Sequence, residues 1–216
     1  KEKAKENGRR KSDYAFGTNP CSEIILRPNQ FCNLTEVVCR PMDTVETLKD
    51  KIEVATILGT IQATLTNFGY LRKRWKDNTE EERLLGVSLT GIMDNSILSR
   101  MRTTLPETLQ DMRQKAVIVN KEWSEKLGIP QSTAIIHARH NPYYIRTVRG
   151  DKKDPLTEFM KDQGIPCEDD VMQPNNSVFS FPMKADSNAI FRHSMSALEQ
   201  LEIWKCYAEH WCEHKP

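Results

Sequence analysis

Apolar residues in the first third of the chain follow two different spacings. Residues 24–40, IILRPNQFCNLTEVVCR, are rich in Ile, Leu, Val, Phe and Thr. This composition favours two short strands, Glu23 to Leu26 and Asn33 to Val38, with a turn at Pro28-Asn29 between them.

A helical spacing follows this strand-like region. Apolar residues then recur every three or four positions, which is typical of one face of a helix. They are Leu48, Ile52, Ala55, Leu58, Ile61, Leu65 and Phe68. We predict one long helix with Asp43 as its N-cap and Gly69 as its stop.

The remaining two thirds of the chain mix both kinds of element. Residues 79–94, TEEERLLGVSLTGIMD, form a second amphipathic stretch of helix and turn character. A helix is expected from Pro106 to Leu127, with Gly128 just past its end. STAIIHA, residues 132–138, and Ser177 to Phe181 are strand candidates. A capping box at Ser196 and Glu199 predicts a last helix through about Glu213. The mixture indicates an α/β or α+β fold.

Composition places the chain among ordinary globular proteins. It has 216 residues, enough for one large domain or two small ones, with 38% hydrophobic and 28% charged residues. Its 31 basic and 30 acidic residues nearly cancel, so charge gives no argument for nucleic-acid binding. No apolar run approaches the roughly 20 residues of a membrane span. We expect no membrane or nucleic-acid partner, and a cytoplasmic location.

The six cysteines stand at positions 21, 32, 39, 167, 206 and 212. Without a secretory signal they favour reduced thiols over a disulfide scaffold. Cys206 and His210 are four residues apart, near Cys212 and His214, but the spacing is a poor match to zinc sites. We therefore expect no metal there, and buried or surface roles for these residues.

The segment NPCSE, residues 19–23, carries a more specific pattern. Pro20 favours extended backbone at Asn19. Asn19, Cys21 and Glu23 share one side if the segment is extended. There Glu23 could take a proton, Asn19 could orient a hydroxyl and Cys21 could react. Cys32, on the returning strand, could supply a second, reducing thiol.

At this point the sequence resembles a known family. TNPCSEI followed by QFCNLTEV is similar to the catalytic segment of ribonucleotide reductases. The interval of eleven residues between the two cysteines resembles the class II, adenosylcobalamin-dependent enzymes, and QFCNL their monomeric branch. GRRKSDYAFGTNPC, RHNPYYIRTVRG, NNSVFSFP and ALEQLEIWKCYAEHWCEHKP agree in the same order. The resemblance covers nearly the whole chain.

The resemblance implies a fold, a chemistry and a role for each candidate residue. Residues 1–216 would be part of the reductase α/β barrel, a partial catalytic domain with a finger loop at the barrel centre. Cys21 would be the thiyl-radical residue that takes the 3′ hydrogen of the ribose, and Glu23 would deprotonate the 3′ hydroxyl. Asn19 would hold the ribose hydroxyls, and Cys32 would be half of the reducing thiol pair. Adenosylcobalamin would be the cofactor, a ribonucleotide, expected to be a triphosphate, the substrate, and a thioredoxin-like protein or a dithiol the reductant.

Three departures from the family pattern shape a second hypothesis. The second redox cysteine of complete enzymes lies near their N-terminus, outside this sequence. The Pro-Ser-Gly-Thr type loop that helps hold substrate phosphates is missing between STAI and HARHNPYY, and the chain stops at CEHKP. We therefore expect a catalytic-core fragment that is inactive alone. The alternative is a non-catalytic piece of a split reductase that needs a partner polypeptide.

A third hypothesis comes from a different class of enzyme. Cys21 could be the nucleophile of a cysteine hydrolase, but this needs an oriented histidine. The histidines at 137, 140, 193, 210 and 214 have no recognisable dyad context.

Overall fold

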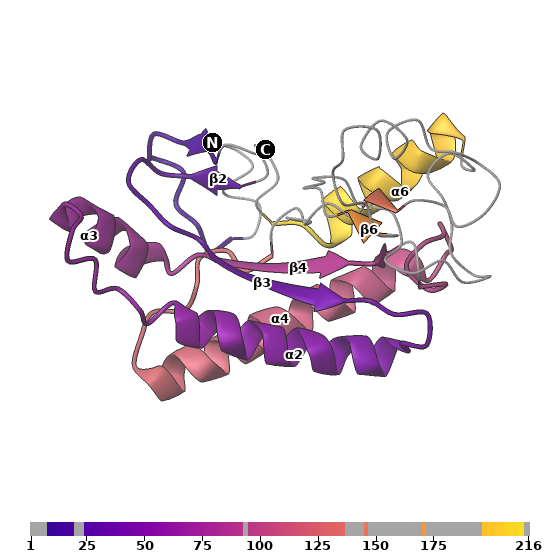
Figure 1. Cartoon of the computed structure of the whole chain (residues 1–216), viewed down its shortest axis with the longest axis horizontal. Helices are drawn as coiled ribbons and strands as arrows, with labels where there is room; N and C mark the ends of the chain where they lie inside the picture. Colours follow the sequence, from indigo (N-terminus) through magenta and orange to yellow (C-terminus); the bar gives the residue numbers. More distant parts are fainter. Residues whose placement is uncertain are drawn as a thin grey trace, which may run out of the picture.

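The computed structural model of the chain describes residues 8–19, 24–92, 95–136, 145–146, 170–171 and 196–213. Its strands are β1 (Gly17–Thr18), β2 (Ile25–Leu26), β3 (Asn33–Val38), β4 (Leu85–Thr90), β5 (Ile145–Arg146) and β6 (Asp170–Val171). Its helices are α2 (Val45–Gln62), α3 (Lys73–Glu82), α4 (Leu105–Leu127) and α6 (Ala197–His210). Figure 1 labels most of these elements.

A parallel β-α-β unit is the centre of the fold. β3 and β4 pair in parallel, with Asn33 opposite Leu85 and Val38 opposite Thr90, and α2 lies in the connection between them (Figure 1). On its other side β4 bridges in parallel to Ile136. The expected α/β class is confirmed, and β3 is confirmed with the predicted bounds.

β4 is buried at all six positions because it lies between two neighbouring strands and beneath covering layers. The prediction of an amphipathic helix-and-turn stretch over residues 79–94 was therefore wrong for Leu85–Thr90, whereas residues 79–82 are helical as predicted. α3 ends at Glu82, and the following residues form this strand. A strand buried on both faces shows no alternation, so its short apolar run cannot be told from a helix by periodicity alone. The strand expected in STAIIHA is supported as far as Ile136.

α2 is shorter than predicted at both ends. Thr44, not Asp43, is the N-cap: its side chain accepts from the backbone N–H of Thr47, whose hydroxyl accepts from the N–H of Thr44. The helix ends at Gln62, and Phe68 packs instead against the ring of Phe31, 5.1 Å between centroids. The apolar spacing of three to four residues continues to Leu65 and Phe68, although the helix itself ends at Gln62. The spacing alone therefore predicted too long a helix.

The buried face of α2 also differs from the predicted stripe. Its buried residues are Leu48, Ile52, Ala55, Thr56, Gly59 and Thr60, whereas Leu58 and Ile61 are 56% and 41% exposed. Gly59 lies against the sheet: a Cβ at this position would lie 3.5 Å from Thr35, an ordinary van der Waals contact. The neighbouring strands and α4 decide which face of α2 is buried, and sequence periodicity does not report these neighbours.

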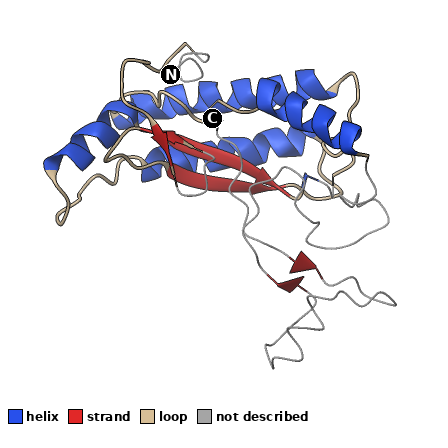
Figure 2. Ribbon diagram, turned by 90° about the horizontal axis from the view of Figure 1, so that it is seen from above, coloured by secondary structure: helices blue, strands red, loops and turns tan. Residues whose placement is uncertain are grey.

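The two later helices agree with expectation. α4 runs Leu105–Leu127 with Pro106 in its first turn, and Gly128 follows at φ +65°. α6 begins with the Ser196–Glu199 capping box and ends at His210, three residues before the predicted end. α4 packs against both α2 and α6. In the view from above, the helices run roughly along the two long strands (Figure 2).

One buried cluster joins these elements. Leu48 and Ile52 of α2 pack with Leu85, Val87 and Leu89 of β4. The same cluster takes in Leu109, Met112 and Ala116 of α4 and Ile203, Cys206 and Tyr207 of α6. The candidate strand Ser177 to Phe181 and the RHNPYY segment before β5 lie outside the described residues.

Candidate functional site

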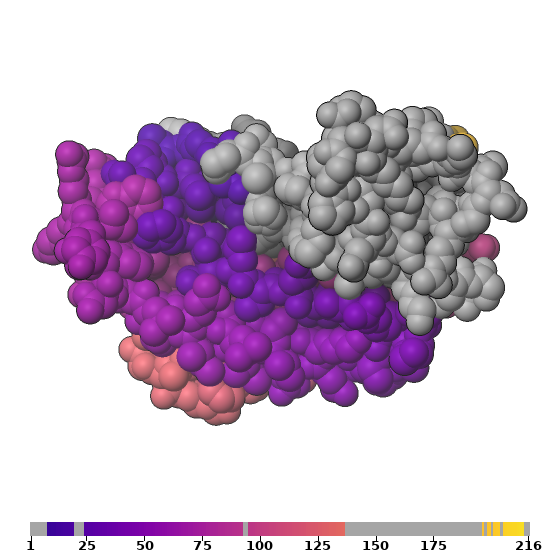
Figure 3. Space-filling model, in the orientation of Figure 1, coloured from indigo at the N-terminus to yellow at the C-terminus, as the bar shows by residue number. Residues whose placement is uncertain are grey.

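A short hairpin carries the NPCSE segment. β1 and β2 pair antiparallel, Gly17 opposite Leu26 and Thr18 opposite Ile25. No strand was predicted at Gly17 and Thr18, and the structure shows that these residues gain a strand partner that the local sequence does not reveal. In the space-filling view the indigo N-terminal residues pack beside α3 (Figure 3).

Asn19 directly follows β1, where the loop of this hairpin begins. Its backbone N–H donates to the carbonyl of Ile24 at 3.2 Å, and its side-chain Oδ1 accepts from the N–H of Ile24 at 3.0 Å. The second of these bonds fixes the orientation of the side-chain amide.

The other three candidate residues are placed unequally. Cys21 and Glu23 lie outside the described residues. Cys32 is half-buried and stands one position before β3. Because Thr35 faces α2, residues of even number in this strand face away from the helix, and an extended backbone places Cys32 on that side too. In sequence, Asn19 lies before β2 and Cys32 lies after it. Only these two of the four candidate residues are described, so the structure does not test whether all four lie together.

A buried ion pair between Arg10 and Glu82 contacts the hairpin through β2. Arg10 donates to Glu82 through Nε at 2.8 Å and through Nη2 at 3.0 Å, and the two side chains are 1% and 3% exposed. Arg10 Nη1 also donates to the carbonyl of Ile25 in β2 at 2.7 Å. Gln30 accepts from Arg10 at 3.3 Å and donates to Glu82. Such a bidentate, fully hydrogen-bonded arrangement satisfies both buried charges.

A second anchor lies closer to solvent. Arg27 donates to Glu81 at 2.8 Å and stacks over the ring of Tyr14 at 3.6 Å, while the Tyr14 hydroxyl donates to Glu81 at 2.5 Å. The hydrogen bonds from Tyr14 and Arg27 hold the pKa of Glu81 below its ordinary value, and the same bond raises the pKa of Tyr14. Both arms of the hairpin are thus tied to the end of α3.

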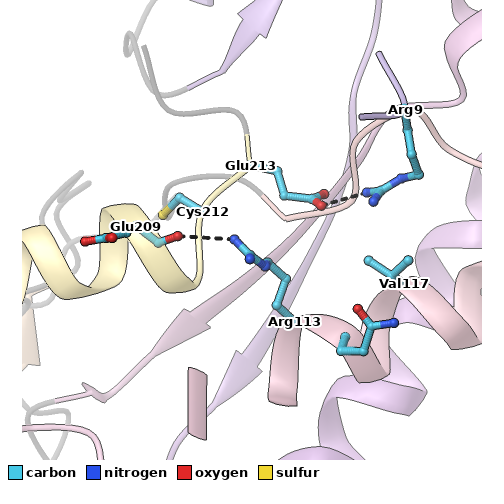
Figure 4. A pocket seen from close by; sticks show the side chains of 7 residues that line it. Arg9, Arg113, Val117, Glu209, Cys212 and Glu213 are labelled. Carbon is cyan, nitrogen blue, oxygen red and sulfur yellow. Dashed lines mark hydrogen bonds and ion pairs between the residues drawn. The ribbon is translucent and has the colours of Figure 1, made fainter. Parts of the chain in front are cut away.

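A cavity of about 310 Å³ lies between the N-terminal segment, α4 and the end of α6 (Figure 4). Arg9 donates to Glu213 across it at 2.7 Å, and Arg113 donates to the carbonyl of Glu209 at 3.3 Å. The second carboxylate oxygen of Glu213 accepts from the backbone N–H of Ile135 at 2.8 Å. These bonds connect the chain after α6 to the strand beside β4.

The remaining described cysteines fit structural roles. Cys39, Cys206 and Cys212 are buried. Burial raises the pKa of Cys206 to about 11, so it stays a neutral thiol near pH 7. His210 contacts Gln110 of α4 at 2.8 Å. Within the described ranges no group of three or more His, Cys, Asp or Glu side chains could hold a metal ion.

Sequence inspection missed Arg10 and Glu82, the most completely buried ion pair described here. Each stands in a run of like charges, Arg9-Arg10 and Glu80 to Glu82, and such runs usually indicate a solvated face. The signal available in the sequence was position: Glu82 stands two residues before the apolar run that begins at Leu84, and Arg10 precedes the hairpin by a few residues.

No protein-family model matches the chain. Among solved structures, it superposes on a crystal structure of a B12-dependent, class II ribonucleotide reductase with a TM-score of 0.60. The match covers 92% of this chain and 34% of that chain at 20% sequence identity. The described fold is therefore that of part of a class II ribonucleotide reductase.

Curated relatives give the same result by sequence. The chain is 25% identical over 244 residues to the adenosylcobalamin-dependent ribonucleoside-triphosphate reductase of Lactobacillus delbrueckii subsp. bulgaricus, covering 92% of this chain and 33% of the relative. The reductases of the same name from Lactobacillus acidophilus and Euglena gracilis are 28% and 24% identical, covering 80% and 95% of this chain. The resemblance seen in the sequence is confirmed: the chain is a homologue of these reductases and spans about a third of their length.

Proposed function

We propose that residues 1–216 form a partial catalytic domain of an adenosylcobalamin-dependent ribonucleoside-triphosphate reductase, the part that carries the radical cysteine. The observation that carries the proposal is the match of 92% of the chain to reductases of that name. The hairpin that presents the NPCSE segment supports it, because radical chemistry needs a reactive thiol held on a defined support.

In this proposal each candidate residue has one task. Cys21, as a thiyl radical, takes the 3′ hydrogen of the ribose, and Glu23 takes the proton of the 3′ hydroxyl. Asn19 orients the ribose hydroxyls through its amide, whose Oδ1 is already held by Ile24. Cys32 is one of the two thiols that reduce the substrate.

The reduction balances with a second thiol. The 2′ hydroxyl leaves as water, a hydrogen replaces it on C2′, and the 3′ hydrogen returns from the Cys21 thiol. Two thiols supply two electrons and two protons and form one disulfide. Cys32 supplies one of them, and a second thiol, which we do not assign among the described residues, supplies the other. A thioredoxin-like protein or a small dithiol then reduces the disulfide.

Adenosylcobalamin, when bound, supplies a carbon-centred radical that can take a hydrogen atom from a thiol. The cavity between α4 and α6 is lined by charged side chains and is too small for a corrinoid. We assign none of the described residues to its binding.

The same proposal includes the cellular setting. No described helix has the length and apolar character needed to cross a membrane. A cytoplasmic location fits a chemistry that depends on reduced thiols. The alternative arrangement is a non-catalytic piece of a split reductase that needs a partner polypeptide.

The test is release of tritium from 3′-labelled ribonucleoside triphosphate in the presence of adenosylcobalamin. The chain is assayed alone and with the complementary reductase segments, each beside Cys21→Ala. We expect release only when the complementary segments are present and Cys21 is intact. Release that survives Cys21→Ala would refute the assigned radical residue. Absence of release from an assembled, cysteine-intact sample would favour a non-catalytic piece.

A further inference from the structure

We infer that Arg10 and Glu82 are positioning residues for the reactive hairpin: their buried pair sets where β1 and β2 stand relative to the parallel strands. The functional meaning of this inference rests on the proposed reductase activity. The placement itself does not.

The guanidinium of Arg10 contacts both arms of the hairpin. Nη1 donates to the Ile25 carbonyl in β2 at 2.7 Å. Its Cζ lies 4.9 Å from the centroid of the Phe16 ring, one residue before β1. A single rigid, planar group therefore fixes both strands that enter and leave the NPCSE segment.

Glu82 connects this guanidinium to the sheet. It is the last residue of α3, three residues before β4 begins. Its backbone carbonyl accepts from the N–H of Thr133 at 3.0 Å, and its carboxylate accepts from the Thr133 hydroxyl at 3.3 Å. Thr133 leads into the strand that pairs with β4. The pair thus relates the hairpin to the amino ends of two adjacent parallel strands.

Burial of this pair indicates positioning more than stability. A buried ion pair gains little net stability over apolar side chains, because desolvation offsets the Coulomb attraction, whereas its fixed geometry specifies one arrangement. The neighbouring Glu81 provides a matched contrast on the same helix. It contacts the same hairpin through Arg27 and Tyr14, but it is 43% exposed, and solvent-screened contacts contribute little.

The test compares Glu82→Gln with Glu81→Gln in the full chain by amide hydrogen exchange. The reporting amides are those of Asn19 and Ile24, which bond to each other where the hairpin loop begins and ends. The reference amides are Leu85 and Val87, which bond to the neighbouring strand. We expect Glu82→Gln to raise the exchange rate of the two hairpin amides about tenfold, and Glu81→Gln to raise it about twofold or less. In both variants we expect a smaller change at the reference amides than at the hairpin amides.

A second variant guards against simple unfolding. Arg10→Met combined with Glu82→Gln removes both buried charges, so we expect its melting temperature to exceed that of Glu82→Gln alone. Because Arg10→Met also removes the bond to the Ile25 carbonyl, we expect hairpin exchange to stay fast. Recovery of hairpin protection together with stability would overturn the positioning role. So would unchanged hairpin exchange in Glu82→Gln, or equal loosening of the reference amides.

Activity adds an independent readout. In the assembled reductase we expect the double variant to lower kcat for tritium release about tenfold, with KM for the nucleotide within about twofold. Unchanged kcat despite a loosened hairpin would overturn the catalytic relevance of the position. Failure of the wild-type sample to release tritium would reject the proposed function, while the exchange result would still decide the placement.

Discussion

Glu81 and Glu82 are adjacent in the sequence but differ in their exposure to solvent. The Glu82 side chain is buried in an ion pair with Arg10, which contacts the hairpin. Glu81 faces water and holds Arg27 and Tyr14 through bonds that its ionised form makes. The hydrogen bonds from these partners hold the pKa of Glu81 below its ordinary value, while the same contact with Glu81 raises the pKa of Tyr14.

A pH dependence of stability follows from Glu81. A lowered folded-state pKa contributes stability that is present above pH 4.5 and lost as the pH falls below this value. We expect Glu81→Gln to lose less stability between pH 6 and pH 3 than the wild type. Urea unfolding at both pH values measures this. Equal losses in the two proteins would show that the contact does not favour the ionised carboxylate.

Cys206 gives a second prediction for a single residue. Its raised pKa, about 11, and its burial keep the thiolate fraction very low at neutral pH. We expect iodoacetamide at pH 8 to label Cys32, which is half-buried, far faster than Cys206, with peptide mass spectrometry resolving the two sites. Equal rates in denaturant provide the control. Comparable rates in the native chain would contradict the burial of Cys206.

At the scale of elements, two glycines predict opposite effects of the same substitution. Gly59 lies inside α2, where an added Cβ would make ordinary contacts at 3.5–3.6 Å with Thr35 and Leu85. Gly128 ends α4 at φ +65°, a conformation that disfavours any Cβ. The local backbone therefore decides the sign of each glycine-to-alanine change.

We expect Gly59→Ala to raise the free energy of unfolding by about 0.5–1 kcal/mol, because alanine has the higher helix propensity. We expect Gly128→Ala to lower it by about 1 kcal/mol, the cost of a left-handed conformation. Chemical denaturation of the two variants side by side is the measurement. Destabilisation by Gly59→Ala would mean that helix and sheet are packed too tightly for a methyl group.

At the scale of the whole molecule, Asn120 joins three layers. It lies in α4, and its Nδ2 donates to Thr60 of α2 at 2.9 Å. Its Oδ1 accepts from the backbone N–H of Ser132, at 3.0 Å, on the way to the strand beside β4. The side chain is 1% exposed, so no water replaces it readily.

We expect Asn120→Ala to destabilise the chain by about 2 kcal/mol, because it leaves the Ser132 amide unsatisfied in the interior. Gln131→Ala provides the control: it removes a 3.3 Å bond to Val117 at a partly exposed site, and we expect under about 0.5 kcal/mol. Thermal unfolding of both variants measures the difference. Similar small losses would indicate that the three layers do not depend on this contact.

The extent of sequence-based prediction differed from feature to feature. β3, α4 and the cap of α6 were predicted correctly because their signals are local: a β-branched run, Pro106 with Gly128, and Ser196 with Glu199. The family resemblance was also local, carried by short motifs around Cys21 and Cys32. The assigned roles of Asn19, Cys21, Glu23 and Cys32 stay predictions.

By itself, the sequence determined the start of α6 at its capping box, the end of α4 before Gly128, the α/β class and the kinship with the reductases. Each of these depends on neighbouring residues or on short motifs. Only the tertiary structure decided that residues 85–90 are a central strand, that β1 pairs with β2, and which residues of α2 are buried. The tertiary structure also paired Arg10 with Glu82 across 72 positions of sequence. These features depend on contacts between segments that are distant in the sequence. Burial against the neighbouring elements decides them, and local residue preference does not.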